Sequence, residues 1–377
     1  MNARRVQTIA RKEYYHLIRD FRSLYLAFII PMLLILLFGY ALSLDVEHIP
    51  TAVVDHDRTP ESRDFIRRLD ASVYFDVVAH PPFTAALTDL LDRNQVILGV
   101  VIPPGWSAEL KADRASPLQV VIDGSDPNTA GNTRAFITAF IAQANEKNLL
   151  DFLNRQGRER IHPPVEGRIR VWFNEDLESR NFIVPGIIAV IIMIVGALLT
   201  SMVIAREYEN GTMETIRSLP VRANEFFLGK AIPYFFITLV DVLVAILMGQ
   251  VLFGVVMKAS FWLMILASTV YILVALSIGL LISVKTRSQL VANQLAVLVT
   301  YLPSLLLSDF VFPQQNMPAV LKAVSTLVPA TYYIDILNGL YLRDLSFLQL
   351  WPSFLMLALM AVLMGALNIR ALKREGL

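Results

Sequence analysis

The sequence of 377 residues contains no cysteine, which excludes disulfide bonds, thiolate nucleophiles and cysteine-ligated metal sites. Charge is also scarce: charged residues make up 17% of the chain, whereas soluble proteins carry about a quarter. Hydrophobic residues make up 55%, and the mean hydropathy is +0.55. They occur in long blocks, which is typical of a protein that spans a membrane. The formal net charge of +1 shows no bias toward nucleic acid, so we expect no nucleic-acid partner.

The sequence also lacks the motifs of ATP or peptide hydrolysis. The phosphate-binding pattern G-x-x-x-x-G-K-[ST] is absent. The only Gly-Lys pair, Gly229–Lys230, is followed by Ala231, and Asn224 stands where the first glycine would be. Neither G-x-S-x-G nor H-E-x-x-H occurs. We therefore expect that this chain is not an enzyme and binds no cofactor itself.

Six long apolar segments predict six membrane-spanning helices. The first, 24–44, has no charged residue, and about 20 apolar residues are enough to cross the hydrocarbon core. The other five are 182–205, 231–256, 261–284, 290–307 and 351–369. Region 308–350 is too apolar for an ordinary loop and is interrupted by prolines, so we predict two outer re-entrant half-helices there. Tyr332, Tyr333 and Trp351 are expected to anchor it at the membrane interface.

Short basic segments predict the orientation of the chain. Residues 1–23 combine apolar positions at helical spacing with flanking basic residues, as in an amphipathic helix on the inner membrane surface. A signal peptide is the alternative, but acidic residues interrupt the basic region and no small-residue cleavage site follows. Segments 206–230, 285–289 and 370–377 also carry lysine and arginine residues, which are what the positive-inside rule counts. The positive-inside rule therefore predicts a multi-pass protein of the cell inner membrane with both termini in the cytoplasm.

Residues 45–180 differ from the rest in charge. They contain 15 Lys/Arg and 21 Asp/Glu, a net charge of −6, and the remaining residues carry +7. Strand patterns alternate with helical ones, which predicts a small α/β domain between the first two spans. The predicted strands are 49–57, 73–78, 96–102, 118–123 and 169–173, and helices are expected after Thr59, from Phe83 and from about Thr129. The expected fold class is an α-helical polytopic membrane protein with six transmembrane helices and an inserted extracytoplasmic α/β domain.

One acidic group in this domain has two interpretations. Asp55, His56 and Asp57 follow a predicted strand and have side chains that bind metal ions. A turn at the end of a strand favours the same residue types. We assign no metal site to the chain.

The most distinctive segment is 206–221, R-E-Y-E-N-G-T-M-E-T-I-R-S-L-P-V, which lies between two apolar spans. Gly211 allows the chain to reverse, Thr212 is expected to cap a short helix, and Pro220 ends it. Glu214 suits the first turn of such a helix. A compact helix on the ends of two spans transmits force because it cannot easily bend. An ordinary polar loop is the alternative, although its three glutamates are unusual where topology favours basic residues.

This segment resembles the coupling loop of the membrane subunit of ABC type-2 exporters, R-E-x-E-x-G-T-x-E followed by Pro-Val. The N-terminal ARKEYYHLIRD and the stretch LLSDFVFPQQNMPAVLKAVSTLVPATYYIDILNGL strengthen the likeness. NEDLESRNFIVPG is similar to the approach to the second span in the subgroup with a large external domain between the first two spans. The chain departs from the family at Asp309, where glycine is usual.

The resemblance implies a permease subunit of an ATP-driven exporter. A separate ABC ATPase subunit, which binds ATP and Mg, would push on the coupling helix. A second copy of the permease or a homologue would complete the membrane path, a periplasmic adaptor is a further expected partner, and membrane lipid surrounds the chain. The residues implied to dock against the ATPase are Arg206, Glu207, Glu209, Gly211, Thr212, Glu214 and Pro220. Drug, lipid, polysaccharide and ion substrates all stay open.

Asp241 is the one carboxylate near the middle of a predicted span. An acid at the bilayer centre costs roughly 2.5–3.5 kcal/mol on insertion scales, so this side chain should face protein or water. In one interpretation it lines a substrate path together with Asn293 and Gln294. In the other it is a structural group that hydrogen-bonds to polar groups on a neighbouring helix, such as Asn293 or Gln294.

Two other functions are compatible with parts of the sequence. A membrane receptor would sense ligands with the 45–180 domain, but it needs a cytoplasmic signalling domain, and the predicted inner loops are short. An ion-coupled secondary transporter would need several intramembrane ionisable residues and two matching halves, neither of which is evident.

Overall fold

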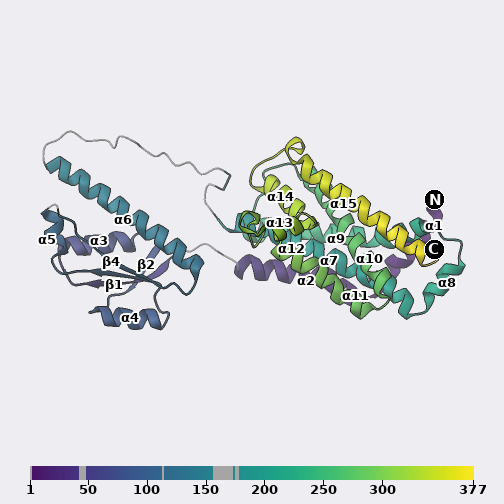
Figure 1. Ribbon diagram of the computed structural model, residues 1–377, viewed down its shortest axis with the longest axis horizontal. Helices are drawn as coiled ribbons and strands as arrows, with labels where there is room; N and C mark the ends of the chain where they lie inside the picture. Colours follow the sequence, from purple (N-terminus) through teal and green to yellow (C-terminus); the bar gives the residue numbers. More distant parts are fainter. Residues whose placement is uncertain (1, 42–47, 113, 156–172, 175–177) are drawn as a thin grey trace. The chain divides into compact units, whose positions relative to one another are not determined.

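The computed structural model describes residues 2–41, 48–112, 114–155, 173–174 and 178–377 (Figure 1). It divides into two compact units. The first, which we call the helical unit, combines Met1–Ser43 with Val171–Leu377, and the second, the α/β unit, is Leu44–Arg170. The α/β unit is thus inserted between two parts of the helical unit.

Five helices in the described residues are long and apolar enough to cross a membrane. They are α7 (Arg180–Glu209), α9 (Ala223–Phe253), α10 (Phe261–Thr286), the interrupted helix Gln289–Leu306 and α15 (Phe347–Arg374). The pair α13 (Ala319–Ser325) and α14 (Pro329–Tyr341) is bent by 79° and makes a sixth only if it crosses as one span. The first predicted span, 24–44, overlaps α2 (Phe21–Ala41), which is counted among the shorter apolar helices over Ala27–Tyr40, the range described there. Six spans were predicted, and the described residues contain five candidates, or six if the bent pair is one span.

Helix α7 lies at the centre of the helical unit. Almost all of its residues from Ile183 to Ala205 are buried, because α2, α9, α10, α11 and α14 pack around it. A helix that is apolar on all sides is expected in such a position. Small residues let α10 approach closely: a Cβ added to Gly279 would lie 2.3 Å from the carbonyl oxygen of Ala197.

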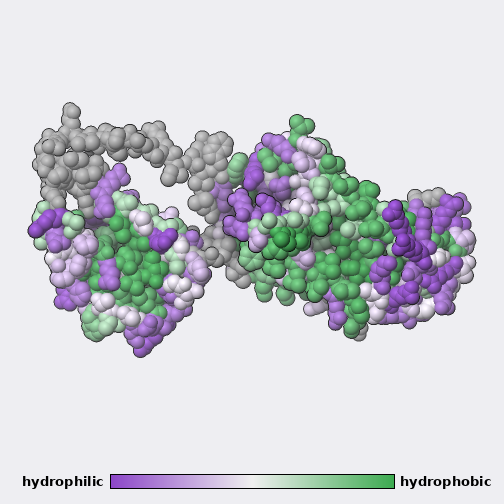
Figure 2. All heavy atoms as spheres, in the orientation of Figure 1, coloured by the Kyte–Doolittle hydropathy of each residue, from purple (hydrophilic) through white to green (hydrophobic). Residues whose placement is uncertain are grey.

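The predicted coupling loop 206–230 is mostly helical. Helix α7 continues to Glu209, α8 (Thr212–Ser218) follows, and α9 already begins at Ala223. Helix α9 ends at Phe253, before the predicted limit of 256, because Gly254 adopts a φ of 66° and closes the helix. Figure 2 shows hydrophilic residues at the end of the helical unit that carries α1 (Ala3–Arg19), α8 and the C-terminus, and apolar residues over its middle.

The fifth predicted span, 290–307, is not a regular α-helix. It consists of α11 (Gln289–Ala296), the π-helical segment η1 (Val297–Tyr301) and α12 (Leu302–Leu306). Pro303 has no N–H to donate to the preceding turn, which explains why the helix widens before it.

The turn that follows contains Asp309, where the family usually has glycine. Asp309 adopts a φ of 70°, in the left-handed region that favours glycine. Its carboxylate accepts a hydrogen bond from the Gln314 N–H at 2.6 Å, which stabilises the turn. The short 3-10 helix η2 (Gln314–Asn316) comes next, before α13. The left-handed turn is therefore present despite the substitution.

The prediction that Tyr333 anchors the chain at the membrane interface is wrong. Tyr333 is fully buried, its ring stacks on Tyr271 with centroids 4.1 Å apart, and its hydroxyl hydrogen-bonds to Ser268 at 2.8 Å. Tyr332 is partly exposed, and Trp351 is exposed. Neighbouring residues on a helix point about 100° apart, so only one of the two tyrosines can face the core. The sequence did not show which of them it is.

The α/β unit is built on a four-stranded sheet with the order β2-β1-β3-β4. Strand β1 pairs in parallel with β2 and β3, and β4 pairs antiparallel with β3. The strands are β1 (Ile49–Asp55), β2 (Phe75–Ala79), β3 (Leu98–Ile102) and β4 (Gln119–Ile122), and the helices are α3 (Pro60–Asp70), α4 (Thr84–Asp92), α5 (Trp106–Lys111) and α6 (Pro127–Arg155). Helices α3 and α6 lie on one face of the sheet and α4 on the other (Figure 1).

Local signals account for much of this unit. Thr59 caps α3 with its side chain and Pro60 is the first helical residue, as expected. Successive β1 residues alternate between the two faces: Val53 packs in the core with α3, and Val54 in the core with α4. Helix α5 was not predicted. The predicted strand 169–173 lies outside the described residues apart from Phe173.

Candidate functional site

Helix α8 connects α7 to α9, and the turn from α7 into α8 contains a residue in the left-handed conformation. Gly211 precedes α8 with a φ of 69° and occupies the N-cap position. A Cβ built on Gly211 would meet nothing within 4 Å, so the backbone conformation alone requires glycine here. Thr212 was predicted to cap the helix, and this is wrong. Because Gly211 takes the cap position, Thr212 becomes the first helical residue, and its hydroxyl donates to the Glu207 carboxylate.

Four charged side chains at the start of α8 form the buried ion cluster: Glu13, Glu207 and Lys230 are buried, and Lys12 lies exposed at its rim. The Lys230 ammonium on α9 donates to Glu207 on α7 and to Glu13 on α1, at 2.6 Å in each case. Lys12 on α1 donates to Glu207 at 3.0 Å. The side chain of Lys230 is only 2% exposed. The cluster therefore ties three helices together at the base of α8.

The buried ion cluster is balanced, with two cations and two anions. Taking charges out of water is costly, and their mutual attraction offsets that cost only when each charge has close partners. Removal of one partner from such a buried pair destabilises a protein by about 3–5 kcal/mol, because the remaining charge is left uncompensated. The geometry predicts that α1, α7 and α9 keep their contact here as a unit.

Other residues of the coupling pattern also hold the helices to one another. The Arg206 guanidinium donates to the Tyr234 hydroxyl at 3.3 Å and lies 3.5 Å from the Asp20 carboxylate. The Glu209 carboxylate accepts from the backbone N–H of Gln289 at 2.8 Å, where α11 begins. These side chains face neighbouring helices of the same chain.

A second group, the tail cluster (Tyr208, Arg217, Arg287 and Glu375), holds the far end of α8. The Glu375 carboxylate accepts from Tyr208 at 2.8 Å, from Arg287 at 2.8 Å and from Arg217 at 3.1 Å. Partial burial by itself would raise the pKa of Glu375, but the hydrogen bonds from Tyr208 and Arg287 hold the pKa below its ordinary value. Sequence analysis missed Glu375, because only its contacts with distant residues distinguish it from an ordinary charged tail.

The opposite side of α8 and the two residues after it form an exposed surface, the α8 outer face. Its members are Glu214, Thr215, Ser218, Leu219 and Pro220. Within the described part of the chain, the Glu214 carboxylate has no hydrogen-bonding or ionic partner, and Leu219 is 51% exposed. The carbonyl of Pro220 accepts a hydrogen bond from Arg5, which fixes the end of the segment against α1. Among the predicted docking residues, Glu214 and Pro220 thus lie on the outer face, and Glu207 lies in the buried ion cluster.

Asp241 lies inside the helical unit, as its cost in lipid predicts. It is 3% exposed, and its Oδ1 has no hydrogen-bond partner in the described residues. Among the described residues no hydrogen bond joins Asp241 to Asn293 or Gln294, the two examples given for the structural interpretation. Both α9 and α11 pack against α7, and sequence patterns do not show whether they also face each other. The Oδ1 of Asn293 likewise lacks a partner in the described residues.

The turn at Asp55–Asp57 is held by hydrogen bonds. Asp55 accepts from Ser62 at 2.7 Å, and Asp57 accepts from Thr59 at 2.6 Å and from the N–H of Ser107 at 3.2 Å. Limited burial would raise the pKa of Asp57, but the hydrogen bonds from Thr59 and Ser107 lower it. No group of His, Asp or Glu side chains in the described ranges is arranged to hold a metal ion. The interpretation as a strand-end turn accounts for these residues.

Comparison with known proteins adds a further line of argument. The chain matches the family described as "ABC-2 family transporter protein" over residues 21–370. It is 33% identical over 376 residues to the "Probable multidrug ABC transporter permease YbhS" of Escherichia coli (strain K12), which covers 99% of this chain and 97% of that protein. It is 26% identical over 371 residues to the "Probable multidrug ABC transporter permease YbhR" of the same organism, which covers 98% and 99%. The "ABC transporter G family member 20" of Dictyostelium discoideum is 21% identical over 369 residues, 97% of this chain and 50% of that protein.

Proposed function

The chain belongs to the ABC-2 transporter family as a permease, and from this premise we propose that it is the pore-forming subunit of an exporter driven at the α8 outer face. A separate ATPase subunit binds ATP and Mg and docks against that face. The relatives named as multidrug permeases support drug-like small molecules as the substrate class. Membership of this family sets aside the receptor and the ion-coupled transporter as alternatives.

The observation that carries this proposal is the contrast between the two sides of α8. Its outer face presents the side chains of Glu214 and Leu219, which have no partner in the described part of the chain, whereas its first residue, Thr212, bonds to Glu207 of the buried ion cluster. A push on the outer face is therefore passed to α1, α7 and α9 together. Rigid-body movement of these helices would open a path between two permease copies, or between this chain and a homologue.

The proposed topology follows from the distribution of charge. The α8 end of the helical unit, with both chain termini, faces the cytoplasm because its segments are rich in lysine and arginine. The acidic α/β unit is then on the outer side of the inner membrane, where it is available to an adaptor protein. The bent pair α13 and α14 forms the outer re-entrant half-helices.

For Asp241 we propose a role in the transport path together with Asn293 and Gln294. A structural hydrogen bond was the alternative, and among the described residues the carboxylate has none to Asn293 or Gln294. A polar group without a partner at such depth is costly, which favours a functional reason for its presence. Asp241→Asn should lower transport in reconstituted vesicles, and unchanged transport would remove the residue from the path.

The proposal is tested by the ATPase activity of the partner subunit with and without the permease. Glu214→Lys reverses a charge on the α8 outer face without touching an internal contact, so stimulated ATP hydrolysis should be lost while the permease stays in the membrane. Glu109→Lys, an exposed substitution on α5, is the matched control and should leave stimulation unchanged. Normal stimulation with Glu214→Lys would contradict docking at this face.

A further inference from the structure

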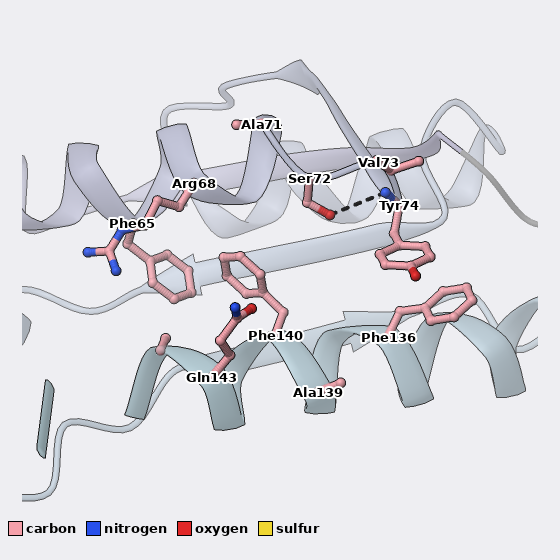
Figure 3. A pocket seen from close by; sticks show the side chains of 11 residues that line it. Phe65, Arg68, Ala71, Ser72, Val73, Tyr74, Phe136, Ala139, Phe140 and Gln143 are labelled. Atoms are coloured by element: carbon pink, nitrogen blue, oxygen red, sulfur yellow. Dashed lines mark hydrogen bonds between the residues drawn. The ribbon is translucent and has the colours of Figure 1, made fainter. Parts of the chain in front are cut away.

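The α/β unit contains a cavity of about 630 Å³ between α3 and α6. Figure 3 shows the rings of Phe65 on α3, of Phe136 and Phe140 on α6 and of Tyr74 in the turn between α3 and β2 facing the space between the helices. Binding sites for drug-sized molecules have volumes of about 300–1,000 Å³, so this cavity is of a suitable size. The proposed coupling at α8 does not require it.

Aromatic side chains form most of the wall. Phe65 on α3 and Phe140 on α6 meet edge to face, with ring centroids 5.4 Å apart. At the other end, Tyr74 stacks on Phe136 at 4.4 Å (Figure 3). Tyr74 is 47% exposed and Val73 is 64% exposed, so solvent reaches the cavity from this side. Such walls favour a flat, apolar ligand, because aromatic rings stack or meet edge to face with other rings.

Among the described residues that line the cavity, the charged one is Arg68 on α3. Its Nε is buried and has no hydrogen-bond partner in the described residues, although another nitrogen of its guanidinium pairs with Asp64. Arg67 also pairs with Asp64, at 3.1 Å. Two guanidinium groups thus share one carboxylate, which leaves a net charge of +1 beside the cavity. A buried donor without a partner and a surplus positive charge both favour an anionic group on the ligand.

We propose that this cavity binds an aromatic amphipathic molecule with one anionic group. The anion pairs with Arg68, and the ring system lies between the Phe65–Phe140 pair and the Tyr74–Phe136 pair. The site goes beyond the proposed coupling function and lies in the other unit of the chain, so the two can fail separately.

The test is photolabelling of the full-length protein in lipid nanodiscs. The probe is 4-[3-(trifluoromethyl)-3H-diazirin-3-yl]benzoic acid, and the corresponding uncharged benzyl alcohol is the neutral control. Mass spectrometry of peptides should find the label on α3 and α6. Arg68→Gln should reduce the affinity for the carboxylate probe about tenfold, the effect of losing a charge-assisted hydrogen bond, and leave the alcohol unaffected.

Matched variants make the result decisive. Arg67→Gln removes the neighbouring guanidinium, which also pairs with Asp64 but does not line the cavity, so it should weaken binding of the carboxylate probe less than Arg68→Gln does and leave the alcohol unaffected. Ala139→Trp fills the space from α6 and should abolish labelling by both probes. Labelling by the alcohol shows that the Arg68→Gln variant is folded.

Several outcomes would overturn the proposal. The first is an equal effect of Arg67→Gln and Arg68→Gln on the carboxylate probe. The second is labelling confined to the membrane helices, which would indicate partition of the probe into lipid. The third is labelling of α3 and α6 that appears only after the permease is separated from its partner subunits. That result would mean that a second polypeptide fills the cavity in the assembled transporter.

Discussion

Two glutamates of the same segment, one at the end of α7 and one on α8, have opposite surroundings. Glu207, at the base of α8, is buried and accepts hydrogen bonds from Lys12, Lys230 and Thr212. Glu214, seven residues later on the outer face, has no partner among the described residues. The first glutamate fixes the position of α8, and the second is available to another chain. The residues of the 206–221 pattern therefore fall into two sets: one contacts neighbouring helices of the same chain, and the other lies exposed on the α8 outer face.

The largest effect on stability is expected at the buried ion cluster. Lys230→Ala leaves Glu13 and Glu207 buried without their main cation, which should cost about 3–5 kcal/mol. The thermal midpoint of the purified permease, followed by size-exclusion chromatography after heating, should fall markedly. Lys322→Ala, on the exposed side of α13, is the control and should not change it. Equal midpoints for the two variants would show that the cluster does not hold the helices together.

A smaller effect on stability is expected at Gly211, in the turn between α7 and α8. Gly211→Ala places a side chain at a φ of 69°, which costs roughly 1–2 kcal/mol. Gly365→Ala is the matched control, since that glycine lies inside α15 with open space around its Cα and an ordinary helical backbone. The thermal midpoint should fall for the first variant and stay or rise for the second, because alanine favours helix. A Gly211→Ala protein as stable as the parent would mean that the turn adopts another conformation.

The smallest effect is expected at the tail cluster, which is partly exposed. Glu375→Gln should cost only about 0.2–1 kcal/mol, as is usual for accessible ion pairs. The pKa of Glu375 is lower in the folded protein than in the unfolded chain, so its stabilisation is complete above the unfolded pKa and is lost as the pH falls through the folded pKa. The difference in thermal midpoint between parent and variant should therefore shrink toward acidic pH. A difference that grows on acidification would contradict this assignment.

The elements that were predicted well depend on neighbouring residues. The Thr59 cap, the strand that begins at Ile49 and the long apolar helices each follow from patterns within a few residues or turns. The break in the fifth span at Val297–Tyr301 also has a local cause, Pro303, but its π-helical form was not expected.

The buried ion cluster could not be predicted because its partners are far apart in the sequence. Lys230 and Glu13 are separated by 217 positions, and only the packing of α1 against α9 brings them together. In the sequence, Lys230 reads as a basic residue at the edge of a span, and Glu13 as an interruption in a basic helix. One signal was present: a lysine directly before a long apolar run needs either water or an anion.

The most direct test of the account is whether the α8 outer face touches the ATPase subunit. Because the chain has no cysteine, Thr215→Cys provides a single thiol, to which benzophenone-maleimide can be attached before the ATPase is added. Irradiation in nanodiscs should cross-link the permease to the ATPase from Thr215→Cys and not from Thr88→Cys, an exposed position on α4 of the α/β unit. No cross-link from Thr215→Cys, or an equal yield from Thr88→Cys, would contradict the claim that α8 receives the ATPase.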